Sequence, residues 1–249
     1  MKNLLLILLL GLIYPATGFC REVTDWLQEP LSNMDMHLSP SLKIFALLVG
    51  LSLLPSLLIM MTSFTRIMVV LSLLRTAIGL QQTPPNSVLI SIGLFLTVFT
   101  MIPVGQKIYV TAVIPYSEKR INETMALKRT ITPIRRFMLA QTHEKDLTFA
   151  LKLAKEPPPQ QASKIPLHVL ILAFMLSELQ TAFQIGFMIF LPFLIIDLIV
   201  SGLLMTLGMM MLPPASIALP LKLLLFISIN GFELILEALV SSFRPIAGT

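Results

Sequence analysis

Four long apolar segments constrain the fold of this chain more than any other feature of its sequence. They occupy residues 44 to about 61, 88–104, 185–211 and 217 to about 236. A helix needs about 20 mostly apolar residues to cross the hydrocarbon core of a bilayer, and these segments approach or exceed that length. Charged residues make up only 12% of the chain, whereas soluble domains contain about 25%. We therefore predict an all-α membrane protein with about four transmembrane segments, arranged as two helical hairpins.

The first membrane hairpin is predicted over residues 44–105. The largely apolar stretch 44–80 is too long for one span, because as a helix it would measure about 55 Å against a hydrocarbon thickness of about 30 Å. Pro55, Arg66 and Arg75 interrupt this stretch. We therefore expect a span that ends near residue 61, followed by an amphipathic continuation whose two arginines face the cytoplasm.

The first 18 residues are expected to be a cleaved signal peptide. Lys2 precedes an apolar run that is too short to cross a bilayer, and Ala16 and Gly18 supply the small residues of a cleavage site. The mature chain would then start outside the cytoplasm, with a periplasmic segment over residues 19–43.

A polar segment separates the two hairpins and is predicted to form a small helical domain over residues 106–183. It carries eleven Lys or Arg and six Asp or Glu residues between Lys107 and Glu178, so we expect it to face water. An exported start followed by two crossings places this domain in the periplasm. Its basic charge does not contradict that placement, because the positive-inside rule is weak for loops longer than about 60 residues.

Two helices are expected inside this domain. Ser117 is placed to cap a helix that begins at Glu118, and Pro133 is placed to begin a second helix. The second helix would continue to residue 154, because its later apolar residues recur at helical spacing. A linker rich in Pro and Gln then extends to residue 166, and helical structure resumes near Leu167.

The second membrane hairpin, residues 184–249, contains two charges inside apolar segments. Asp197 and Lys222 lie at similar distances from the expected turn, and either charge facing lipid alone would cost several kcal/mol. We therefore expect them to form an intramembrane ion pair. A structural pair that fixes the hairpin is favoured over a proton or ion relay, because no further acidic residues extend the chain of charges.

Three consecutive methionines, Met209, Met210 and Met211, lie at the turn of this hairpin. Methionine is flexible and apolar, so the cluster suits plastic packing at the membrane interface. It equally suits a deformable seal around something that passes through. From the residue pattern alone both interpretations stay open.

No pattern in the sequence indicates catalysis, a cofactor or a metal site. The three histidines are scattered, and no Cys and His spacing matches a metal motif. The formal net charge of +5 does not indicate nucleic-acid binding, because no basic stripe accompanies a recognisable binding module. An enzyme is therefore the least favoured class.

Several motifs are spread over most of the mature chain. The shorter ones are Ser63-Phe64-Thr65-Arg66-Ile67, Thr83-Pro84-Pro85-Asn86, Phe137-Met138-Leu139, Gln141-Thr142 and Glu144-Lys145-Asp146-Leu147. The longer ones are Ser177-Glu178-Leu179, Thr181-Ala182-Phe183-Gln184-Ile185-Gly186-Phe187, Pro192-Phe193-Leu194-Ile195-Ile196-Asp197, Gly208-Met209-Met210-Met211-Leu212-Pro213-Pro214 and Leu219-Pro220-Leu221-Lys222. In these motifs the chain resembles the FliP/SctR family, whose members are export gate subunits of type III secretion.

The resemblance implies a subunit without a reaction of its own in the flagellar type III protein export gate. It implies several copies of the chain, joined by two smaller FliQ-like and FliR-like membrane subunits, around a path for unfolded flagellar substrates. The expected location is the bacterial inner membrane, in the flagellar basal body. The resemblance also implies a gasket formed by Met209, Met210 and Met211, and subunit contacts formed by Phe137, Phe149 and Glu178.

Two other functions remain as alternatives. The first is the homologous injectisome gate, which exports virulence effectors; the expected signal peptide favours the flagellar branch over it. The second belongs to a different class, an ion-coupled transporter of small solutes with Asp197 and Lys222 as its coupling site. This alternative lacks a clear internal repeat between the two hairpins and does not explain the methionines.

Overall fold

The computed structural model describes residues 40–80, 83–157, 165–209 and 211–244, and these residues form helices and no strand. The expected signal peptide, residues 1–18, lies outside the described residues. The chain divides into two compact units, Met1–Pro55 and Ser56–Thr249. All-α architecture is therefore confirmed for the described part of the chain.

Helix α3, Pro40–Met60, is apolar along most of its length. Ile44, Phe45, Leu48 and Leu53 are all more than half exposed. Pro55 lies inside the helix, and the helical structure breaks only after Met60. The predicted division of the long apolar stretch near residue 61 is confirmed, and the break does not lie at the proline.

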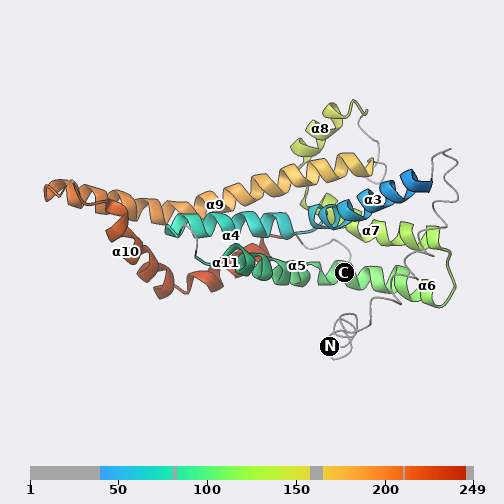
Figure 1. Ribbon diagram of the computed structural model, residues 1–249, viewed down its shortest axis with the longest axis horizontal. Helices are drawn as coiled ribbons and strands as arrows, with labels where there is room; N and C mark the ends of the chain where they lie inside the picture. Colours follow the sequence, from blue (N-terminus) through green and yellow to red (C-terminus); the bar gives the residue numbers. More distant parts are fainter. Residues whose placement is uncertain (1–39, 81–82, 158–164, 210, 245–249) are drawn as a thin grey trace. The chain divides into compact units, whose positions relative to one another are not determined.

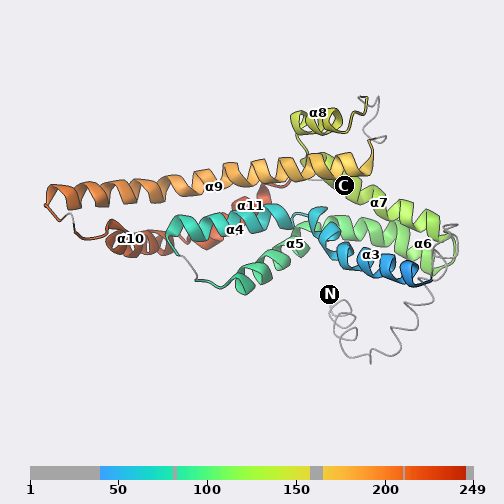
Figure 2. The same cartoon turned by 45° about the horizontal axis from the view of Figure 1, so that its top comes forward.

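Helix α4, Phe64–Ile78, is amphipathic and packs along α9, as both views show (Figures 1 and 2). Its buried apolar residues recur at helical spacing: Ile67, Val70, Leu71, Leu74 and Ile78. The helix ends at Gly79, whose φ of 94° lies in the left-handed region that favours glycine. A continuation of this kind was predicted from the sequence.

Three helical segments follow without interruption: α5 (Asn86–Ile108), the π-helical turn η1 (Tyr109–Val113) and α6 (Ile114–Ser117). Together they form a continuous apolar helix of 32 residues. The predicted cap at Ser117 is wrong, because Ser117 is the last residue of this helix and does not precede a new one; the helix also continues past residue 104, where the second apolar segment ends.

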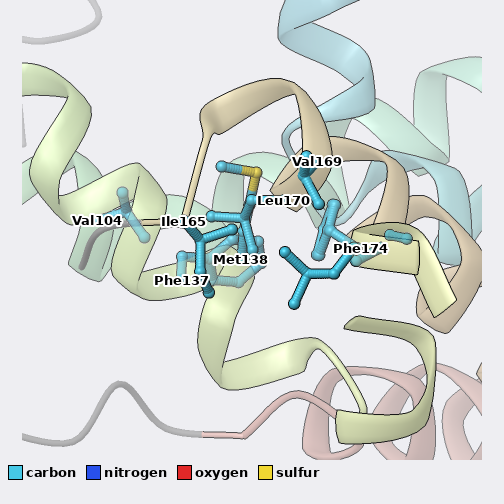
Figure 3. Close-up of a cluster of buried hydrophobic side chains, with 10 residues drawn as sticks. Val104, Phe137, Met138, Ile165, Val169, Leu170 and Phe174 are labelled. Atoms are coloured by element: carbon cyan, nitrogen blue, oxygen red, sulfur yellow. The ribbon is translucent and has the colours of Figure 1, made fainter. Parts of the chain in front are cut away.

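Helix α7, Glu123–Gln141, begins after Asn122 and contains Pro133 in its interior, so the prediction that Pro133 starts a helix is wrong. Helix α8, Glu144–Leu153, buries Ala150 and Leu151 as their spacing predicted. These two helices and the start of α9 enclose a core that includes Val104 (Figure 3). At its centre the rings of Phe137 and Phe174 meet edge to face, with centroids 5.9 Å apart.

Helix α9, Leu167–Thr206, is a single helix of 40 residues that begins where the sequence predicted. It runs through residues 183 and 184 without a break, so the predicted boundary between domain and hairpin falls inside one helix. Helices α10 (Pro214–Ser228) and α11 (Gly231–Ser241) follow and are bent by 65° at the intervening break.

Two described helices are long and apolar enough to cross a membrane, Asn86–Ser117 and Leu167–Thr206. The bent pair α10 and α11 adds a third if it is counted as one span. The break between them divides the fourth apolar segment that the sequence predicted as one span. The structure therefore supports a membrane protein with two or three spanning helices among its described residues.

The close packing of α4 on α9 is testable at Gly186. A Cβ atom there would lie 2.3 Å from Leu73 Cδ1 and 3.3 Å from Leu73 Cβ. We expect Gly186→Leu to lower the free energy of unfolding by about 1–3 kcal/mol through overpacking, measured by thermal unfolding in detergent micelles. The matched control is Gly202→Leu on the same helix, where nothing lies within 4 Å. Equal unfolding temperatures for the two variants would contradict close packing at Gly186.

Candidate functional site

The methionine turn, residues 207–213, connects α9 to α10. The α9 helix closes with hydrogen bonds from Gly208 N–H to Met205 O (3.1 Å) and from Met209 N–H to Leu204 O (3.0 Å). Gly208 has a φ of 73°, which suits glycine and ends the helix sharply. Met209 is 44% exposed and Met211 is 99% exposed, whereas Met210 lies outside the described residues. The turn therefore presents at least two thioether side chains away from the packed core.

Asp197 on α9 and Lys222 on α10 form an ion pair between the two arms that lead to this turn. Lys222 Nζ lies 2.7 Å from Asp197 Oδ2 and also donates a hydrogen bond to Ala77 O at 3.3 Å. Ala77 lies in the last turn of α4, where unpaired carbonyls favour a cation. The pair thus joins three helices.

The two charges differ in burial. The side chain of Lys222 is 8% exposed, whereas that of Asp197 is 48% exposed. Apolar packing closes the hairpin between the pair and the methionine turn through Val200, Leu204 and Ala218. One oxygen of Asp197 is therefore held inside the hairpin, while part of its carboxyl group faces outward.

A second ion pair, which the sequence analysis did not foresee, lies fully inside the chain. Arg66 on α4 binds Glu178 on α9 through two contacts, Nη2 to Oε1 at 2.5 Å and Nε to Oε2 at 3.0 Å. The two side chains are 2% and 0% exposed. Arg66 Nη1 also donates to Ser242 O and Oγ, both at 3.1 Å, and the guanidinium lies 4.1 Å from the ring centroid of Phe243. One arginine thus connects α4, α9 and the residues after α11.

This geometry places Arg66 and Glu178 against each other inside the chain. Arg66 was predicted to lie on the cytoplasmic side, and within this chain its guanidinium is buried and neutralised by a carboxylate across the helix interface. Glu178 is likewise buried within the chain, and its expected contact with another subunit stays a prediction. The two residues are 112 positions apart, and no spacing rule connects residues so distant in sequence.

Phe137 and Phe149, the other two residues predicted to contact a neighbouring subunit, differ in exposure. Phe137 is 2% exposed and packs in the core of Figure 3, so it does not offer surface to a neighbour either. Phe149 on α8 is 55% exposed, and its contact role stays a prediction. Arg75 is half-buried and donates hydrogen bonds to Asn86 Oδ1 (2.7 Å) and Pro84 O (3.3 Å), which ties the turn before α5 to α4.

A small polar network attaches α8 to α9. Ser177 Oγ donates to Asp146 Oδ2 at 2.6 Å and accepts from the His143 N–H at 2.9 Å. Both contacts lie at the N-terminus of α8, where backbone N–H groups need partners. In the part of the chain that the structure describes, no group of three or more His, Cys, Asp or Glu side chains could hold a metal ion.

The buried ion pair predicts that neutralising Glu178 lowers the free energy of unfolding far more than neutralising the exposed Glu118. Glu178→Gln leaves the Arg66 guanidinium buried without a countercharge, so we expect the free energy of unfolding to fall by about 3–5 kcal/mol. Glu118 forms an exposed pair with Arg120, so Glu118→Gln is expected to change it by about 0–1 kcal/mol. Thermal unfolding of the purified variants measures both. A Glu178→Gln variant as stable as Glu118→Gln would contradict the structural importance of the pair.

The ion pair of Asp197 and Lys222 predicts that opposite charges at these two positions are needed, and that which position carries which charge matters less. Asp197→Lys and Lys222→Asp alone each place two like charges together, and we expect each to abolish activity or insertion. The double variant restores opposite charges, and we expect it to recover membrane insertion and thermal stability, measured by cell fractionation and by thermal unfolding in detergent. Loss of activity in a double variant that still inserts and assembles would argue for a relay that needs the acid at position 197.

Comparison with known proteins places the chain in a family. The FliP family profile matches residues 47–239. The chain is 47% identical over 236 residues to the flagellar biosynthetic protein FliP of Pectobacterium carotovorum subsp. carotovorum, covering 95% of this chain and 92% of that protein. It is 48% identical over 206 residues to FliP of Caulobacter vibrioides, covering 83% and 77% of the two chains. It is 46% identical over 207 residues to FliP of Bacillus subtilis, covering 83% and 94%. The chain therefore belongs to the FliP family.

Proposed function

We propose that this chain is a pore-forming structural subunit of the flagellar type III protein export gate. It assembles in several copies, with two smaller FliQ-like and FliR-like subunits, into a conduit for unfolded flagellar proteins across the bacterial inner membrane. The relatives are named flagellar biosynthetic proteins, which favours flagellar over injectisome substrates. The observation that carries the proposal is the exposed methionine turn at the end of a hairpin whose arms are fixed by an ion pair.

The surface of the hairpin supports assembly with other subunits. Large apolar side chains on α9 are more than half exposed, among them Phe187, Met188, Leu198 and Ile199. Lipid or another subunit can cover such side chains equally well. The carboxyl group of Asp197 on the same helix is not suited to lipid, because an exposed charge there is costly. A neighbouring subunit that covers α9 satisfies both requirements.

The methionine turn supports a sealing role. Met211 is almost entirely exposed, so its side chain adds little to the core of its own chain. Thioether side chains are flexible and apolar, so several copies around a pore can close on one another and still adapt to a passing chain. We propose that Met209, Met210 and Met211 together form this gasket, and that Phe149 contributes to contacts between subunits.

The ion pair is better suited to structure than to solute coupling. Lys222 is buried against both Asp197 and a backbone carbonyl, so its charge is already neutralised within the hairpin. A relay needs further titratable groups in sequence.

We also propose that the chain has no catalytic reaction and no bound cofactor. The gate would reside in the flagellar basal body, with the segment between the hairpins on the periplasmic side.

Replacing the three methionines tests the gasket. We expect the variant carrying Met209→Ala, Met210→Ala and Met211→Ala to increase ion leak through the gate, because alanine leaves the constriction open. Leak and export of flagellar subunits are measured in the same cells. Met125→Ala, a substitution of a 48% exposed methionine on α7 outside the hairpin, is the control and should change neither. Unchanged leak and export in the triple variant would refute the gasket.

A further inference from the structure

A basic pocket lies between the end of the apolar helix and α7. Its volume is about 390 Å³, and it is lined by Lys107, Val110, Thr111, Pro115, Arg129, Thr132, Pro133 and Arg136. Three of these side chains are cationic, and none of the described lining residues is acidic. A pocket of this size is large enough for a small organic ligand. Its charge therefore favours an anion.

The backbone explains why these residues converge. Arg129, Thr132 and Arg136 are three, four or seven positions apart and share one face of α7. On the opposite wall, η1 is a π-helical turn, a feature that often marks functional sites. Pro115 has no N–H to donate to Thr111 O four residues earlier. Arg129 Nη1 instead donates to this carbonyl at 3.3 Å, which holds one cation at the pocket.

The position of the pocket along the helix indicates which anion it would meet. The segment from Asn86 to Gly105 has no charged residue, and Lys107 is the first charge after it. From Asn86 to Lys107 the helix rises about 32 Å, which matches a hydrocarbon thickness of about 30 Å. Tyr109 and Tyr116 are 58% and 38% exposed just beyond, and exposed tyrosines are typical of the headgroup level. A bilayer crossed by Asn86–Lys107 would have its phospholipid headgroups at the level of this pocket.

We propose that this pocket binds the phosphate group of an anionic phospholipid headgroup. The cations of the pocket provide charge-assisted donors for phosphate oxygens, and guanidinium groups can do so in pairs. The hydroxyls of Thr111 and Thr132 already donate to Lys107 O (2.7 Å) and Lys128 O (2.9 Å), so the donors for phosphate are the cations. Val110, Pro115 and Pro133 suit the apolar part of a headgroup and its glycerol. Basic pockets beside membrane helices bind anionic headgroups on the same physical grounds. This site does not depend on the proposed pore.

Lipid retention by the full chain tests the site. The purified protein in detergent is titrated with phosphatidylglycerol or with zwitterionic phosphatidylcholine, and bound lipid is counted by native mass spectrometry. We expect phosphatidylglycerol to be retained preferentially. Arg129→Gln and Arg136→Gln are each expected to weaken retention about fivefold, and the double variant about 25-fold, from about 1 kcal/mol per cation. Because both arginines are exposed, we expect these variants to fold.

Two controls keep the test specific. Lys128→Gln removes one positive charge from the same helix at an exposed residue that does not line the pocket, and it should leave retention unchanged. Arg129→Lys with Arg136→Lys keeps the charge and should preserve most of the binding. Equal retention of the two lipids, or equal losses in Lys128→Gln and in the single arginine variants, would overturn the proposal.

A competition arm identifies the source of the phosphate. Inorganic phosphate at millimolar concentration is added to the protein with bound phosphatidylglycerol. Displacement of the lipid would show that the phosphate group alone is recognised, whereas retention would show that the headgroup with its acyl chains is the ligand. Either result supports the site and assigns its source.

Discussion

The buried pair of Arg66 and Glu178 is the interaction on which the rest of the fold depends. In an apolar chain, hydrophobic contacts alone do not fix how one helix slides along another, because many registers bury similar area. A bidentate ion pair with no exposed surface permits only one register of α4 on α9. The same guanidinium holds the residues that follow α11. The position of the methionine turn is therefore set by a contact far from it in sequence.

The other internal polar contacts follow the same physical rule. Lys222 has a carboxylate and a carbonyl as partners, and the side chain of Gln141 donates to Arg244 O (2.9 Å) and accepts from Arg244 N–H (3.2 Å). Each contact satisfies a group that would be costly if left alone in an apolar environment. Each also joins segments that are distant along the chain. Polar groups are thus few, and most of them determine which apolar faces meet.

The sequence predicted the properties that depend on local pattern. Apolar length predicted the two described helices that are long enough to cross a membrane. Apolar spacing predicted the buried face of α8 at Ala150 and Leu151, and the turn at Gly208 lies where it was predicted. The helix starts predicted at Ser117 and Pro133 are wrong, because Ser117 ends a helix and donates its hydroxyl to Ile114 O, and Pro133 lies inside α7. Neither residue type alone marks the start of a helix. The partner of Arg66 could not be predicted from one sequence, since Glu178 meets it only through the tertiary packing of α4 on α9.

The length of α9 has a mechanical consequence. A helix of 40 residues is about 60 Å long, and it connects the Asp146 and Ser177 network near its start to the methionine turn at its end. If such a rod tilts as a rigid body by about 10° around its first turns, its far end moves by about 10 Å, a distance comparable to the width of a helix. In this chain α4 is bound to α9 by the Arg66–Glu178 pair and to the hairpin by Lys222, so α4 must move with the helix. The Asp146 and Ser177 network and the thioether side chains are therefore the two ends of one braced helix.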